Sequence, residues 1–207
     1  MSVADTYFAI GKTITQITVD AKQMKPAYDS QRALLCRNAI EPELLKQLAN
    51  AASRAQFVSD TVEHLGHRWI ESPSVIGTAV QLVLNRPELI DWLKSVTGFT
   101  AAGAIEGRLV ESRPGGEDHL SWHRDTVPNA RYEFGLTLHL RPCRYEGGAF
   151  EMRDSKSKQS LFYHYPADPG DLLIFEVDHR SEHRVTPVES GEARLVFTGW
   201  FIADATN

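Results

Sequence analysis

Several features are scarce in this sequence of 207 residues, and each scarcity excludes a class of protein. Only two cysteines occur, Cys36 and Cys143, and they lie far apart, which favours reduced thiols over a disulfide framework. Lys and Arg form no run and the net charge is −5, so we expect no nucleic-acid-binding surface. No apolar run approaches the roughly 20 residues of a membrane-spanning helix, and the first residues resemble no secretory signal. These absences predict a cytoplasmic protein that binds neither membrane nor nucleic acid.

The rest of the composition is ordinary for a globular protein. Hydrophobic residues make up 42% of the chain and charged residues 24%, close to the averages for folded domains. A chain of this length suits one domain with a sizeable core, and no repeat, low-complexity tract or linker divides it. We therefore expect a single domain over residues 1–207 and leave its oligomeric state open.

The first hundred residues carry mainly helical patterns. Residues 33–36 indicate a short buried strand, and residues 1–30 alternate loosely enough to predict an edge strand. Pro42 lies in a predicted first helical turn, and the apolar residues that follow it have helical spacing. Similar patterns predict helices over about 74–84 and from Pro87 to Gly98, whereas residues 61–72 show no clear period. Residues 1–100 are therefore expected to be mostly helical support.

From Ala104 onward, short alternating segments are separated by turn residues. They predict eight strands, at about residues 104–112, 119–125, 133–141, 148–153, 159–165, 171–177, 182–188 and 194–202. Eight short strands after a helical first half predict a mainly β fold with flanking helices. We expect a double-stranded β-helix, or jelly roll, over residues 103–202, with the helices packed on one outer face.

The segment Ser121-Trp122-His123-Arg124-Asp125 contains the strongest functional signal. In an extended segment alternate side chains share one face, so His123 and Asp125 point the same way, about 6–7 Å apart along the strand. With His183 they form a set of two histidines and one carboxylate. Such a set leaves open positions on an iron(II) ion, although zinc or another divalent ion could occupy the same ligands.

The surroundings of these residues resemble the 2-oxoglutarate/Fe(II)-dependent oxygenases, in particular their prolyl 4-hydroxylase-like branch. A Gly-rich turn at Pro114-Gly115-Gly116 precedes the first ligands, and an apolar strand at 171–175 leads to His183. A second strand, 194–201, begins with an arginine. The resemblance covers roughly residues 103–202.

The resemblance implies an oxidoreductase that uses Fe(II), 2-oxoglutarate and O₂, with ascorbate as an optional reductant. Such an enzyme hydroxylates an unactivated C–H bond of a peptidyl residue such as proline, a free amino acid or a small metabolite, and releases succinate and CO₂. Arg194 would bind the distal carboxylate of 2-oxoglutarate through a bidentate pair. Because Asp125 is present, hydroxylation is favoured over halogenation.

Other positions are candidates for cosubstrate or substrate contacts. His139 occupies the strand position where the related hydroxylases often carry a tyrosine, and Arg113 lies near the place of a second family tyrosine. Arg131 and Arg141 lie in predicted loops around the mouth and are candidates for an anionic substrate. Two other readings remain open: a cupin-type metalloenzyme that uses no 2-oxoglutarate, and a non-catalytic metal-binding sensor module.

Overall fold

The computed structural model describes residues 6–125 and 132–204 of the chain, which form four helices and fifteen strands. The helices are α1 (Ala21–Gln31), α2 (Pro42–Ala52), α3 (Ile76–Leu84) and α4 (Pro87–Thr97). The strands of the first half are β1 (Phe8–Ile10), β2 (Thr15–Ile17), β3 (Ala33–Cys36), β4 (Phe57–Val62) and β5 (Gly66–Glu71). The remaining strands are β6 (Gly103–Ser112), β7 (His119–His123), β8 (Tyr132–His139), β9 (Tyr145–Gly147), β10 (Phe150–Asp154), β11 (Ser160–His164), β12 (Leu172–Glu176), β13 (Ser181–Val185), β14 (Val188–Gly191) and β15 (Arg194–Ala203).

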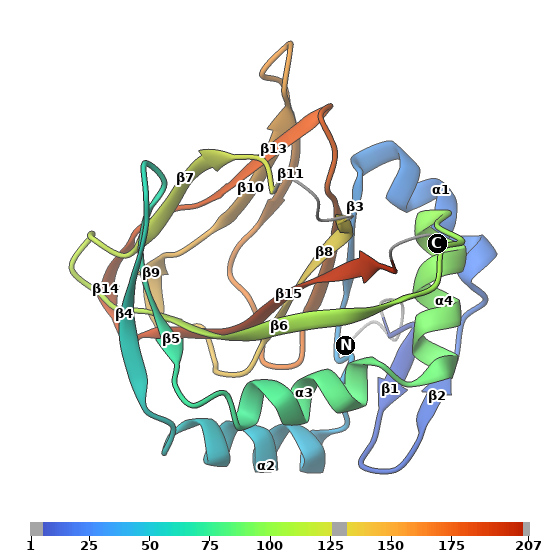
Figure 1. Ribbon diagram of the computed structural model, residues 1–207, viewed down its shortest axis with the longest axis horizontal. Helices are drawn as coiled ribbons and strands as arrows, with labels where there is room; N and C mark the ends of the chain where they lie inside the picture. Colours follow the sequence, from blue (N-terminus) through green and yellow to red (C-terminus); the bar gives the residue numbers. More distant parts are fainter. Residues whose placement is uncertain (1–5, 126–131, 205–207) are drawn as a thin grey trace.

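One 11-stranded sheet dominates the fold. Its strands follow the order β11-β10-β13-β7-β5-β6-β15-β8-β12-β3, and β4 pairs with β5. The pairs are antiparallel, and β15 is hydrogen-bonded along its length to both β6 and β8. The sheet curves until β7, β13, β10 and β11 face β6, β15, β8 and β12 (Figure 1). This nearly closed antiparallel structure confirms the predicted jelly roll.

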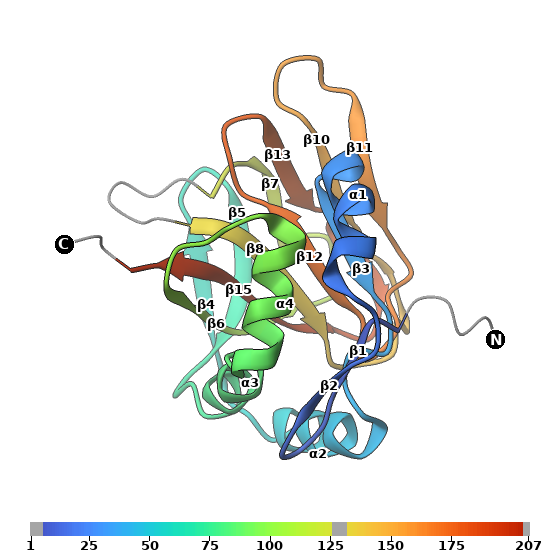
Figure 2. The same cartoon turned by 90° about the vertical axis from the view of Figure 1, so that its right-hand side faces the viewer.

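The main hydrophobic core lies between the helices and the outer face of the sheet. Leu89, Leu93 and Val96 of α4 are fully buried, as are Phe134 and Phe197 of the sheet. Helix α4 covers β8, β12 and β15, and α1 packs against β3 and α4 (Figure 2). The prediction that helices pack on one outer face is therefore confirmed. A smaller cluster, which includes Phe150, Met152 and Phe175, fills part of the space inside the curved sheet.

A buried carboxylate fixes the start of α3. Glu71, at the end of β5, accepts hydrogen bonds from the backbone N–H groups of Val75, Ile76 and Gly77, at 3.2, 2.8 and 2.8 Å. These donors have no partner within the helix, and a negative charge is favourable at this end of the helix dipole. Glu71 therefore couples the position of α3 to β5, a strand that lines the candidate site.

The first half departs from the expected pattern in two places. Residues 57–71 form the β4–β5 hairpin, and β5 joins the main sheet between β6 and β7. Residues 1–30 contribute the separate β1–β2 ribbon and α1, which begins after the N-cap Asp20 and contains Pro26. The helices near Pro42, at 76–84 and from Pro87 agree with the prediction, and Gly98 ends α4 in the left-handed conformation.

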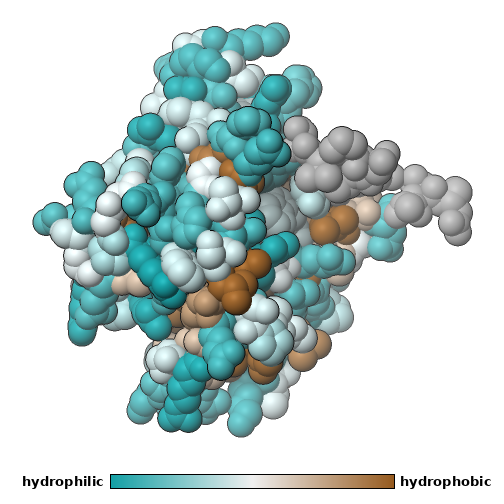
Figure 3. Space-filling view, turned by 60° about the vertical axis from the view of Figure 1, so that its left-hand side comes forward, coloured by the Kyte–Doolittle hydropathy of each residue, from teal (hydrophilic) through white to brown (hydrophobic). Residues whose placement is uncertain are grey.

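The surface carries no large apolar area on the face shown in Figure 3, which is mainly hydrophilic with small hydrophobic patches. Among the residues described, none of the helices has the length and apolar character required to cross a membrane.

Candidate active site

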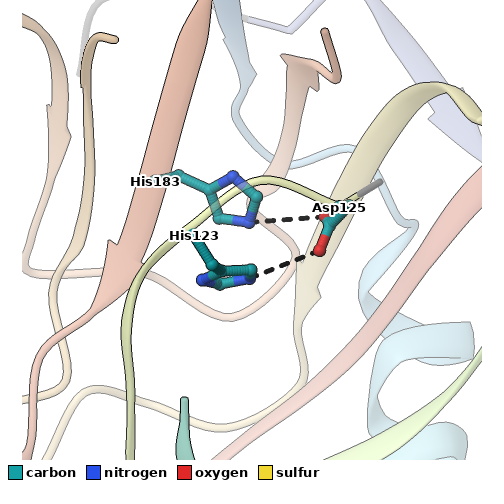
Figure 4. A group of neighbouring side chains, drawn as sticks. All are labelled: His123, Asp125 and His183. Atoms are coloured by element: carbon teal, nitrogen blue, oxygen red, sulfur yellow. Dashed lines mark ion pairs between the residues drawn. The ribbon is translucent and has the colours of Figure 1, made fainter. Parts of the chain in front are cut away.

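The fold brings His123, Asp125 and His183 together inside the curved sheet (Figure 4). His123 ends β7, and its Cα partner on β13 is His183. The Nε2 atom of His123 lies 3.3 Å from Oδ1 of Asp125, and the Nε2 atom of His183 lies 3.4 Å from Oδ2. One donor atom from each residue lies within 4.8 Å of the other two. The spacing predicted from the sequence therefore produces three converging ligand atoms.

Neighbouring hydrogen bonds fix the orientation of two of these side chains. Nδ1 of His123 lies 2.7 Å from the carbonyl oxygen of Ser121. A carbonyl only accepts, so Nδ1 carries the proton and the lone pair of the neutral ring is on Nε2. The indole Nε1–H of Trp200 donates to Oδ2 of Asp125 at 2.7 Å. Contacts of this kind orient metal ligands and tune their affinity.

The surroundings of these three side chains shift their pKa values. Burial lowers the pKa of His183 to about 4, against the opposing charge of Asp125, so this imidazole is neutral at pH 7. Burial also lowers the pKa of His123, but the hydrogen bond and negative charge of Asp125 outweigh it and raise the pKa. Burial alone would raise the pKa of Asp125, but the two imidazoles and Trp200 lower it to about 2. Two imidazoles and one carboxylate that is ionised at pH 7 fit a divalent first-row metal ion.

Arg194 is a buried cation without a carboxylate partner. Its relative exposure is 3%, and no carboxylate among the described residues forms an ion pair with it. Its Nε atom has no hydrogen-bond partner there. Burial lowers the pKa of the guanidinium, and a hydrogen bond with Tyr145 opposes the shift. Because a buried charge normally has a partner, this arrangement points to an anionic ligand.

The three converging residues and Arg194 line the same cavity, which encloses about 620 Å³ of empty space when its open mouth is counted. Strand alternation on β15 explains the lining, since Arg194, Val196, Thr198 and Trp200 all face inward. The remaining lining residues come from β5, β6, β7, β8, β10, β12 and β13, and include Arg68, Ser112, Thr137, Phe150, Phe175 and Val185. Aromatic rings shield the inner end: Phe175 and Phe150 lie 4.8 and 5.5 Å from the His183 ring.

Three other residues predicted from the sequence, His139, Arg113 and Arg141, do not line this cavity. His139 is buried beside it, and burial followed by the positive charge of Arg194 holds its pKa well below the usual value. Arg113 and Arg141 pair with Glu111, at 2.9 and 3.5 Å, and Arg113 also covers the Trp69 ring. Arg131 lies outside the described residues.

Sequence reasoning missed two supporting residues, Trp200 and Tyr145. Each contacts a residue that is distant along the chain, Asp125 and Arg194 respectively. The inward alternation of β15 could have placed Trp200 in the cavity. No local signal identifies Tyr145, which lies on the short strand β9.

Comparisons with known proteins agree with this geometry. Residues 109–202 match the 2OG-Fe(II) oxygenase superfamily. No curated protein sequence matches the chain. Solved structures of similar fold include a Pseudomonas putida prolyl-4-hydroxylase, with a TM-score of 0.67 and 16% identity over 89% of this chain and 100% of that one. Another is a Trichoplax adhaerens prolyl hydroxylase in complex with a hypoxia inducible factor oxygen degradation domain peptide fragment, with a TM-score of 0.65 and 16% identity over 88% of this chain and 89% of that one. A third is EvdO2 from Micromonospora carbonacea var. aurantiaca complexed with 2-oxoglutarate, with a TM-score of 0.60 and 13% identity over 92% of this chain and 93% of that one.

Proposed function

We propose that this chain, whose residues 109–202 match the 2OG-Fe(II) oxygenase superfamily, hydroxylates an unactivated C–H bond. The reaction consumes 2-oxoglutarate and O₂ and releases succinate and CO₂. Iron and 2-oxoglutarate, when bound, supply the oxidising chemistry. The residues of the chain bind and orient these groups and exclude water from them.

His123, Asp125 and His183 are the proposed iron ligands. The hydrogen bond to Ser121 presents Nε2 of His123 to the metal, and Trp200 holds Asp125 in place. Burial keeps His183 neutral, which metal binding requires because a protonated imidazole has no lone pair. The carboxylate offsets part of the charge of the ion. With only three protein ligands, a bound iron ion would keep open positions, and it would supply the oxidising chemistry of the reaction.

The observation that carries the proposal is Arg194, which lines the same cavity and has no carboxylate partner among the described residues. A guanidinium matches a carboxylate through two parallel hydrogen bonds, and the distal carboxylate of 2-oxoglutarate would supply the missing counterion. Thr137, Ser112 and Thr198 add hydroxyl groups to the lining. His139 is buried close enough to Arg194 to feel its charge, but it does not line the cavity.

The substrate is a small molecule or a peptide. The prolyl hydroxylases of similar fold make a peptidyl proline one candidate. A free amino acid or a small metabolite remains equally compatible with the cavity.

Succinate release is the direct test. The chain, loaded anaerobically with Fe(II) and then exposed to O₂ and 2-oxoglutarate, should form succinate, and a substrate from a panel of peptides, amino acids and metabolites should accelerate it. A protein that binds Fe(II) but neither binds nor consumes 2-oxoglutarate would contradict the proposal and favour a cosubstrate-independent metalloprotein.

A further inference from the structure

A second arginine, Arg68, lines the cavity on the wall formed by β5. The proposed iron ligands His123, Asp125 and His183 line the same cavity. The Arg68 side chain is 15% exposed. Arg68 is therefore a cation in the wall of the cavity, near the proposed metal ligands.

Only the Nε group of the Arg68 guanidinium has a hydrogen-bond partner among the described residues. Asp60, the cross-strand neighbour of Arg68 on β4, accepts a hydrogen bond from Nε at 2.8 Å. Among the described residues, Asp60 is the sole ion-pair and hydrogen-bond partner of this side chain. The pair fixes the direction of the guanidinium and leaves both Nη groups without a protein acceptor. Two parallel N–H donors on one fixed edge are the arrangement that binds a carboxylate.

The neighbouring carboxylates of the described residues are already engaged by other groups. His67 bonds through Nδ1 to Asp118, at 2.5 Å, and through Nε2 to Ser59, at 2.8 Å. Asp118 also accepts the backbone N–H of Arg113. Asp125 is the one carboxylate that lines the described cavity, and it already contacts two imidazoles and Trp200. Among the described lining residues, no free carboxylate is therefore left to pair with the Nη groups of Arg68.

The rest of the lining is largely apolar and includes Val110, Leu120 and Val185. A ligand that fits these walls has an apolar body and an anionic end. Arg194 does not serve this ligand, because the proposed function assigns it to 2-oxoglutarate.

We propose that Arg68, held by Asp60, is a specificity-determining residue that binds a carboxylate of the substrate and orients the substrate toward the metal site. This inference rests on the proposed function and narrows its substrates to molecules with a carboxylate within reach of the reacting carbon. The carboxylate belongs either to a small metabolite or amino acid or to an acidic side chain of a peptide.

The test uses the protein loaded anaerobically with Fe(II) and saturated with 2-oxoglutarate, so that Arg194 is occupied. The probes are hexanoate and its neutral counterpart hexanamide, and the measurement is the dissociation constant from ligand-observed NMR. The variants are Arg68→Gln and a matched control, Arg184→Gln. Arg184 forms the same kind of cross-strand pair, with Nε 2.7 Å from Glu151, but lies outside the cavity.

Hexanoate should bind the wild type and Arg184→Gln with equal affinity, and Arg68→Gln about tenfold or more weakly, as expected for loss of a charge-assisted pair. Hexanamide should bind all three weakly and alike. A blocked tripeptide with a central glutamate, compared with its glutamine counterpart, shows whether a peptide carboxylate is also accepted. Equal affinity of hexanoate for the wild type and Arg68→Gln, or of hexanoate and hexanamide for the wild type, overturns the inference.

The affinity for 2-oxoglutarate, measured in the same samples, keeps the two claims apart. Arg68→Gln should retain Fe(II) and 2-oxoglutarate at wild-type affinity, because Arg68 is neither a proposed iron ligand nor the proposed partner of 2-oxoglutarate. A wild type that fails to bind 2-oxoglutarate refutes the proposed function. A wild type that binds 2-oxoglutarate but does not distinguish hexanoate from hexanamide refutes only the role of Arg68.

Discussion

Replacing Arg194 by methionine should have opposite effects on the stability of the ligand-free protein and on its affinity for 2-oxoglutarate. Arg194 is 3% exposed and has no carboxylate partner among the described residues. Replacing a buried charge by an apolar side chain of similar length is often neutral or stabilising, by about 1–4 kcal/mol. Against this, Tyr145 loses a hydrogen-bond partner, which costs about 1 kcal/mol. The free energy of unfolding of the empty variant should therefore equal or exceed that of the wild type.

Binding should respond in the opposite way. Removing one partner of a buried charge pair costs about 3–5 kcal/mol, because the other charge is left uncompensated. Since about 1.4 kcal/mol corresponds to a factor of ten, the dissociation constant of 2-oxoglutarate should rise about a hundredfold or more. Iron binding should persist, because Arg194 is not a proposed ligand.

Urea unfolding of the Fe(II)-loaded protein under anaerobic conditions measures both effects. At a 2-oxoglutarate concentration one hundred times the wild-type dissociation constant, the ligand stabilises the wild type by about 2.7 kcal/mol, and a variant with hundredfold weaker affinity by only about 0.4 kcal/mol. Arg184→Met, outside the cavity, is the control and should behave as the wild type does toward the ligand. Equal stabilisation of the wild type and Arg194→Met by 2-oxoglutarate would refute the assignment of Arg194.

Two further predictions concern residues around the site. Burial lowers the pKa of His164 to about 4, so the stability that depends on its neutral form is complete above pH 6.5 and is lost as the pH falls toward 4. At pH 5 the free energy of unfolding should have fallen by about 2 kcal/mol from this cause. Urea unfolding at pH 7.5 and pH 5 should therefore show a smaller loss of stability for His164→Gln than for the wild type. An equal loss of stability in the wild type and the variant would show that groups other than His164 cause the acid sensitivity. Trp200→Phe removes the hydrogen-bond donor to Asp125 and should lower the affinity for Fe(II) about 10–100-fold, measured in competition with a chelator. Trp122→Phe is the control and should leave this affinity unchanged. The Trp122 ring lies under Arg153 and does not line the cavity.

Much of the jelly roll is predictable because its strands alternate or are continuously apolar. Strand β15 alternates between the interior of the curved sheet and the core under the helices, and β12 is buried along most of its length. The β4–β5 hairpin escapes prediction because most of its residues are partly exposed, without a buried face of period two. Helix α1 escapes prediction because it contains Pro26 and buries only Ala21 and Tyr28.

The same distinction holds for the site. The His123–Asp125 spacing is local, and an extended segment predicts both side chains on one face. In the structure β7 ends at His123, and Asp125 follows two residues later. The contacts of Trp200 with Asp125, of Tyr145 with Arg194 and of His67 with Asp118 depend on how distant segments pair. Sequence patterns therefore indicate the candidate ligands. The fold is needed to show which neighbouring side chains orient these ligands and that Arg68 lines the same cavity.

The most direct test of the account is the Fe(II) content of three proteins after anaerobic loading, measured together with succinate release. The wild type and His119→Ala, which alters a histidine of the same cavity outside the proposed ligand set, should each bind one Fe(II) per chain and form succinate. His183→Ala should bind Fe(II) weakly and form no succinate. A His183→Ala protein that retains Fe(II) and turns over 2-oxoglutarate as the wild type does would contradict the assignment of the metal site.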